Sequence, residues 1–148
     1  LPPGTGDIQL TMAQKIPVAG AVIVTTPQDI ATLDARKALK MFEKLDIAVL
    51  GLVENMAVHV CSNCGHAEHI FGEGGAARMS EQYGVPVLGS LPLQIGIRQQ
   101  GDAGTPIVAA QPDSAAAQAY REVARVMLAQ LDKRPKVRSG IMASLLGG

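Results

Sequence analysis

The sequence has few aromatic side chains, with two Phe, two Tyr and no Trp among 148 residues. Its interior must therefore consist mainly of Val, Ile, Leu, Ala and Met, a mixture typical of buried parallel strands covered by Ala-rich helices. A charge excess is also absent, because 13 basic residues balance 13 acidic ones. This balance argues against a surface for nucleic acid or anionic membranes, so we expect neither partner.

Long apolar runs are lacking as well. The longest, at residues 18–24 and 47–53, are too short to cross a bilayer, and no Lys/Arg-led apolar segment opens the chain. These absences predict a soluble, cytoplasmic protein. The chain begins with Leu-Pro-Pro rather than Met, and we interpret it as a fragment of a longer protein.

The chain contains no Gly-x-x-x-x-Gly-Lys-Ser/Thr motif, and so no lysine-bearing loop that cradles phosphates. The glycine-rich stretch 72–75 is instead predicted to be a turn into a helix. Residues 2–7 read Pro-Pro-Gly-Thr-Gly-Asp, in which Gly4 and Gly6 would let backbone N–H groups approach an anion. Asp7 would either hold a magnesium-bound water or cap the helix that follows.

Three apolar, β-branched runs predict strands at residues 19–25, 47–53 and 85–91. None alternates cleanly between apolar and polar residues, which indicates that both faces are covered. Helical spacing and capping residues predict four helices, at residues 27–45 with Thr26 as N-cap, 75–83 ending at Gly84, 94–100, and 114–131 with Asp113 or Ser114 as the cap.

The order strand–helix–strand–loop–helix–strand–helix predicts an α/β fold with a parallel sheet flanked by helices. We assign residues 1–131 to one domain. Residues 132–148 form a basic, glycine-ended tail that we expect to be poorly ordered.

Both cysteines lie in one polar loop, Cys61-Ser62-Asn63-Cys64-Gly65. Two thiols separated by two residues can face one metal or each other. A full thiolate site needs four ligands, and three arrangements remain open. A second chain could supply another pair of thiols, nearby histidines could complete a zinc site, or the thiols could form a redox couple. The candidate zinc ligands are His59, His66 and His69.

Six motifs, in this order along residues 1–131, resemble the Mrp/ApbC family of iron–sulfur cluster carrier ATPases. This family is a branch of the ParA/MinD-like (SIMIBI) P-loop NTPases. The motifs are Pro2-Pro3-Gly4-Thr5-Gly6-Asp7, Thr25-Thr26-Pro27-Gln28-Asp29-Ile30-Ala31, Val53-Glu54-Asn55-Met56, Cys61-Ser62-Asn63-Cys64-Gly65, Ile70-Phe71-Gly72-x-Gly74-Gly75-Ala76 and Gly89-x-Leu91-Pro92-Leu93.

The resemblance implies roles that the residues alone do not. Gly4, Thr5, Gly6 and Asp7 match the switch II loop, with Asp7 as the candidate catalytic residue, and Asn55 and Pro92 match the adenine side of the nucleotide site. Cys61 and Cys64 match the pair that, with the same pair of a second subunit, holds a [4Fe–4S] cluster in a homodimer. On this basis the bridging cluster is favoured over zinc.

The implied function is transfer of the cluster to apo iron–sulfur proteins, dependent on ATP and Mg²⁺ in the full-length protein. The family's Walker A loop, its Walker B aspartate and its N-terminal strands would lie upstream of Leu1. Without them we expect no ATP hydrolysis by the chain alone, and poor solubility or assembly with the missing half. A MinD-like role on membranes or DNA is disfavoured, because residues 114–131 are Ala-rich rather than basic and strongly amphipathic.

Overall fold

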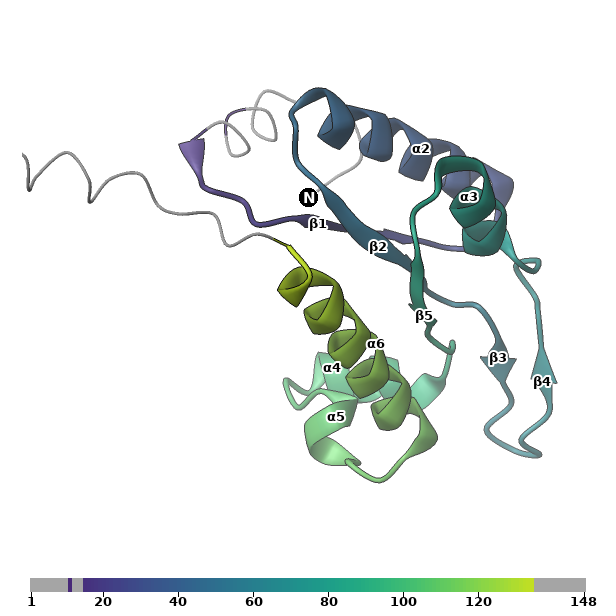
Figure 1. Ribbon diagram of the computed structural model, residues 1–148. Helices are drawn as coiled ribbons and strands as arrows, with labels where there is room; N and C mark the ends of the chain where they lie inside the picture. Colours follow the sequence, from purple (N-terminus) through teal and green to yellow (C-terminus); the bar gives the residue numbers. More distant parts are fainter. Residues whose placement is uncertain (1–10, 12–14, 135–148) are drawn as a thin grey trace, which may run out of the picture.

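A computed structural model describes residue 11 and residues 15–134 of the chain. Gly4, Thr5, Gly6 and Asp7, together with the tail beyond Arg134, lie outside the described residues. The elements, labelled in Figure 1, are β1 (Ala21–Thr25), α2 (Asp29–Lys44), β2 (Val49–Glu54), β3 (His59–Val60), β4 (Ala67–Glu68), α3 (Gly75–Tyr83), β5 (Val87–Ser90), α4 (Ile95–Asp102), α5 (Ile107–Ala110) and α6 (Ala115–Asp132).

A three-stranded parallel sheet in the order β1-β2-β5 forms the centre of the fold. Strand β1 pairs with β2 over its whole length, and β2 pairs with β5 through Leu52↔Val87, Val53↔Gly89 and Glu54↔Ser90. The three predicted strands are thus confirmed, and each begins two residues later than predicted. Because the strands are parallel, the loops that follow them meet at one edge of the sheet.

Helices cover the sheet from both sides (Figure 1). On one face, α2 and α3 pack over Ile23 and Leu52, in a core that also contains Leu39 and Met79, both fully buried. On the other face, α6 packs over Val53 and other side chains of the sheet, namely Val22, Leu88 and Leu91. The prediction that both faces of the strands are covered is therefore confirmed for β2.

Strand β1 is covered less completely than β2. Its Ile23 faces α2 and is buried, whereas Val24, on the opposite face, is 60% exposed. Within the described residues, this face of β1 is therefore only partly covered.

The predicted caps are partly confirmed. Gly84 ends α3 in the left-handed conformation, and its N–H donates to the Ser80 carbonyl. The Ser114 side chain accepts a hydrogen bond of 3.2 Å from the N–H of Ala117 and so caps α6. The cap predicted for the first helix is wrong, because Gln28 occupies the N-cap position and the Thr26 hydroxyl donates to the Gln28 side-chain oxygen instead.

Two features were not predicted. Residues 59–68, interpreted as an irregular loop, contain the short antiparallel strands β3 and β4. Strands of two residues are too short to show periodicity, so their pairing depends on the turn between them. The one-turn helix α5 also escaped prediction, because four residues carry no helical pattern.

Among the described residues, no helix combines the length and apolar character needed to cross a bilayer.

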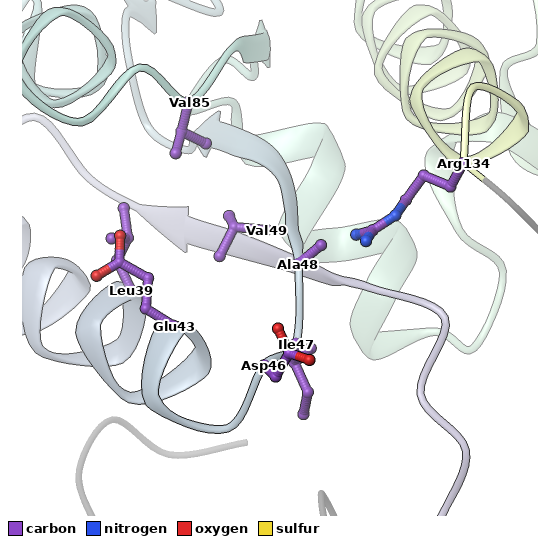
Figure 2. Close-up of a pocket in the computed structure, with 8 residues that line it drawn as sticks. All are labelled: Leu39, Glu43, Asp46, Ile47, Ala48, Val49, Val85 and Arg134. Atoms are coloured by element: carbon purple, nitrogen blue, oxygen red, sulfur yellow. The ribbon is translucent and has the colours of Figure 1, made fainter. Parts of the chain in front are cut away.

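A pocket of about 330 Å³ lies at the amino end of β2, with Glu43 and Asp46 on one side and Arg134 on the other (Figure 2). Ligands of parallel α/β sheets bind at the carboxyl ends of the strands, so this pocket lies at the opposite end from the expected site.

Candidate metal centre

The two cysteines lie in the turn of a small hairpin, formed by residues 59–68 and here called the cysteine hairpin. Its strands pair through His59↔Glu68 and Val60↔Ala67, and it stands apart from the helical layers (Figure 1). The Cys61 N–H donates to the His66 carbonyl, and the Gly65 N–H donates to the Cys61 carbonyl, both at 2.9 Å. These two bonds turn the chain so that the backbone N–H and the side chain of Cys64 come within hydrogen-bonding reach of the Cys61 thiol.

Gly65 allows this turn. Its φ of 74° lies in the left-handed region that favours glycine. A glycine directly after the second cysteine therefore lets the backbone wrap around the two thiols.

Both thiols are free, with Cys61 half-buried and Cys64 exposed. The pKa of Cys61 is lowered from that of an ordinary thiol, first by the backbone N–H of Cys64, then by that of Asn63 and by the Cys64 side chain. Partial burial and the charge of Glu68 oppose this shift. Converging N–H groups therefore stabilise the anionic sulfur, which is the form that binds metals.

This environment predicts the pH dependence of Cys61 alkylation. A lowered pKa means that the thiolate is populated at lower pH, so the midpoint of the alkylation rate should fall below that of an unstructured peptide with the same residues 59–68. Glu68→Gln should lower the midpoint further, because it removes a negative charge that raises the pKa. Mass-spectrometric alkylation rates across pH measure both shifts, and a midpoint equal to that of the peptide would contradict this account.

Hydrogen bonds fix the base of the cysteine hairpin to the sheet. The Leu93 N–H donates to the Val58 carbonyl at 2.8 Å, and the Val60 N–H donates to the Leu93 carbonyl at 3.2 Å. On the returning side, His69 Nδ1 lies 2.8 Å from the Ala57 carbonyl. The exposed turn thus rests on an ordered base connected to the segment after β5.

The geometry does not support the zinc alternative. His69 Nδ1 is engaged with Ala57, and its Nε2 lies 3.5 Å from Glu73. His59 Nδ1 faces Glu68 across the hairpin at 3.4 Å. Within residues 15–134, no three His, Cys, Asp or Glu side chains come together as a metal site. One chain therefore offers two sulfurs and no further ligands in the part that the structure describes.

Asn55 and Pro92 follow the carboxyl ends of the paired strands β2 and β5. The Asn55 N–H donates to the Thr25 carbonyl at 2.7 Å, and its side-chain oxygen accepts from the Met56 N–H at 3.0 Å. The Leu91 N–H donates to the Glu54 carbonyl at 2.8 Å and holds the two strand ends together. Both predicted adenine-side residues thus lie at one edge of the sheet, the edge from which the cysteine hairpin also emerges.

Comparison with known proteins assigns the family. The model of the family described as "ParA: NUBPL iron-transfer P-loop NTPase" matches residues 1–128. The chain belongs to this family.

Similar members come from bacteria and mammals. The iron-sulfur cluster carrier protein of Pseudomonas fragi is 66% identical over 84% of this chain, and that of Escherichia coli K12 is 58% identical over 88%. The mouse iron-sulfur cluster transfer protein NUBPL is 48% identical over 92%. The chain spans 43%, 36% and 43% of the lengths of these three proteins.

Solved structures agree with this assignment. A nucleotide-binding protein of Archaeoglobus fulgidus in complex with ADP matches 70% of this chain, with a TM-score of 0.61 and 42% identity. The cell division ATPase MinD of Pyrococcus furiosus matches 86%, with a TM-score of 0.66 and 26% identity. The chain covers 43% and 49% of these two structures. It therefore has the fold of the MinD-like P-loop NTPases and represents part of that domain, as predicted.

One further residue at this edge of the sheet, Glu54, was not predicted from the sequence. Glu54 ends β2 and is only 7% exposed, and its carboxylate accepts a hydrogen bond from the N–H of Ala76. The available signal was a charged residue that directly follows a buried apolar run, where a carboxylate requires a partner. That partner lies 22 residues away, so the sequence pattern did not identify it.

Proposed function

We propose that the full-length protein containing this chain carries a [4Fe–4S] cluster and delivers it to apo iron–sulfur proteins. The observation that carries the proposal is the pair of free thiols in an exposed turn, in a chain whose relatives are named iron-sulfur cluster carrier and transfer proteins. The cluster is cargo rather than a permanent cofactor, and the exposed position of Cys64 suits a site that must release it.

A second copy of the chain would complete the site. A cubane cluster takes four thiolates, and the described part of one chain offers two. Two cysteine hairpins related by a twofold axis supply the full set, and each can approach because its turn stands clear of the helices (Figure 1). The backbone N–H groups of Asn63 and Cys64 would then donate hydrogen bonds to Cys61 as a cluster ligand. Hydrogen bonds to the ligand sulfurs are one of the factors that set the reduction potential of a cluster.

The proposal also includes an ATP-dependent step in the cytoplasm. Asn55 and Pro92 would contact the adenine, while Gly4, Thr5, Gly6 and Asp7 would form switch II, with Asp7 as the catalytic candidate beside Mg²⁺. These roles are supported by the family membership of the chain and by the position of Asn55 and Pro92 at the carboxyl edge of the sheet. Residues 1–131 would belong to the ATPase domain, with 132–148 as an appended tail. The missing Walker motifs would come from the remainder of the protein.

Anaerobic reconstitution of the full-length protein with ferrous iron and sulfide tests this proposal. We expect sulfur-to-iron charge-transfer absorbance, four irons per two chains, and a dimer in native mass spectrometry. The loaded protein should then activate an apo iron–sulfur enzyme. A monomer that holds a complete cluster would overturn the site shared by two chains. A dimer that cannot transfer its cluster would overturn the carrier role.

A further inference from the structure

Glu54 is a buried carboxylate to which the proposed function assigns no role. It is the last residue of β2 and is 7% exposed, and its Oε1 accepts a hydrogen bond of 2.8 Å from the N–H of Ala76. Ala76 lies in the first turn of α3. A buried charge is costly unless it is hydrogen-bonded, and a helix N-terminus offers both N–H donors and a favourable dipole.

The helix lacks a cap of its own. Its N-cap residue is Gly74, which has no side chain, so a free N–H in the first turn must find an acceptor elsewhere. Glu54 supplies that acceptor from the end of a neighbouring strand. The first turn of α3 is thereby joined to the sheet rather than to the segment that precedes it.

Close packing holds this junction in place. A Cβ atom on Gly75 would lie 2.8 Å from the Pro27 carbonyl oxygen and 3.0 Å from Thr32 Cγ2. The start of α3 therefore presses against the segment that leads into α2. The helix cannot shift toward that segment to replace a lost contact with Glu54.

The Glu54–Ala76 bond closes a large loop. The chain leaves the sheet after Glu54, runs through the cysteine hairpin, and returns at Gly75. The Glu54 carbonyl also accepts from the Leu91 N–H at 2.8 Å, and Leu93 pairs with the base of the cysteine hairpin. One residue thus connects β2, the segment after β5 and the first turn of α3, all of which border the loop that carries the thiols.

We propose that Glu54 is a positioning residue that fixes both ends of residues 55–75 and thereby sets the orientation of the cysteine hairpin on the sheet. The inference deepens the proposed function, on which it rests for its biological meaning. A cluster shared by two chains needs each thiol pair held at a defined place relative to the other subunit. The hairpin itself is two residue pairs long, so its orientation depends on its anchors.

Three variants of the full-length protein test the role of Glu54. Glu54→Gln keeps the length and an acceptor oxygen and removes the charge, whereas Glu54→Asp keeps the charge and shortens the reach. Glu81→Ala, on an exposed position of α3, is the matched control. In the apo protein, amide hydrogen exchange of residues 55–76 should accelerate about tenfold or more in Glu54→Asp, as expected for loss of a hydrogen bond to a charged group. Glu54→Gln should keep most of the protection seen in the unaltered protein, because an acceptor oxygen remains at the same reach. Glu81→Ala should leave exchange unchanged.

The reconstituted protein gives the second readout. Glu54→Asp should change the visible circular dichroism of the cluster, which reports the geometry of its ligands, while Glu54→Gln should resemble the unaltered protein. Equal acceleration of exchange in β1 and β2 would show a general stability role and overturn the inference, as would unchanged exchange and spectrum in Glu54→Asp. If the unaltered protein binds no cluster while exchange changes locally, the proposed function fails and the anchoring by Glu54 stands.

Discussion

Cys61→Ser in the full-length protein is expected to reduce the iron and sulfide retained after anaerobic reconstitution to background. In the proposed homodimer both chains carry the substitution, so the change removes two of the four thiolate ligands. Serine keeps the size and polarity of the side chain but offers no soft sulfur ligand for iron. Iron and sulfide analysis after gel filtration measures the loss, and Cys64→Ser should give the same result.

His66→Ala is the matched control for this experiment. It lies in the same turn, and only its backbone carbonyl is used, as the acceptor from the Cys61 N–H. The substitution should therefore leave cluster content nearly unchanged. Full loading of Cys61→Ser would contradict the proposed cluster site, and loss of metal in His66→Ala would indicate a histidine ligand instead.

Leu39→Ala is expected to lower the free energy of unfolding by about 2–5 kcal/mol. Leu39 is fully buried on the inner face of α2, in the cluster with Ile23, Leu52 and Met79. Removing its side chain loses apolar burial and leaves a cavity that the surrounding sheet and helices fill only partly. Chemical denaturation followed by circular dichroism measures the change.

Leu33→Ala on the same helix is the control for this prediction. Leu33 is 46% exposed, and the same chemical change there should cost about 0.5 kcal/mol or less. Equal costs at the two positions would show that Leu39 does not lie in the core as described. Neither substitution touches the cysteine hairpin, so the iron content of the folded protein should stay constant.

Local chemistry in the sequence determined much of the fold. Apolar β-branched runs predicted β1, β2 and β5, because a strand covered on both faces has few polar residues. Gly84 and Ser114 marked the ends of helices, since each satisfies backbone groups within a few residues. The spacing of Cys61 and Cys64 likewise identified the candidate site, because two residues between thiols suffice to bring them together.

Tertiary structure decided the features that depend on distant partners. The cysteine hairpin pairs through four residues and is held by Leu93, which lies beyond another strand and helix. Glu54 and Ala76 are 22 residues apart, and His69 reaches Ala57 across 12. A sequence pattern records the propensities of neighbouring residues, whereas these contacts arise only when the parallel sheet brings its carboxyl ends to one edge. The sequence therefore identified the thiols, and the packing around that edge determined how they are held.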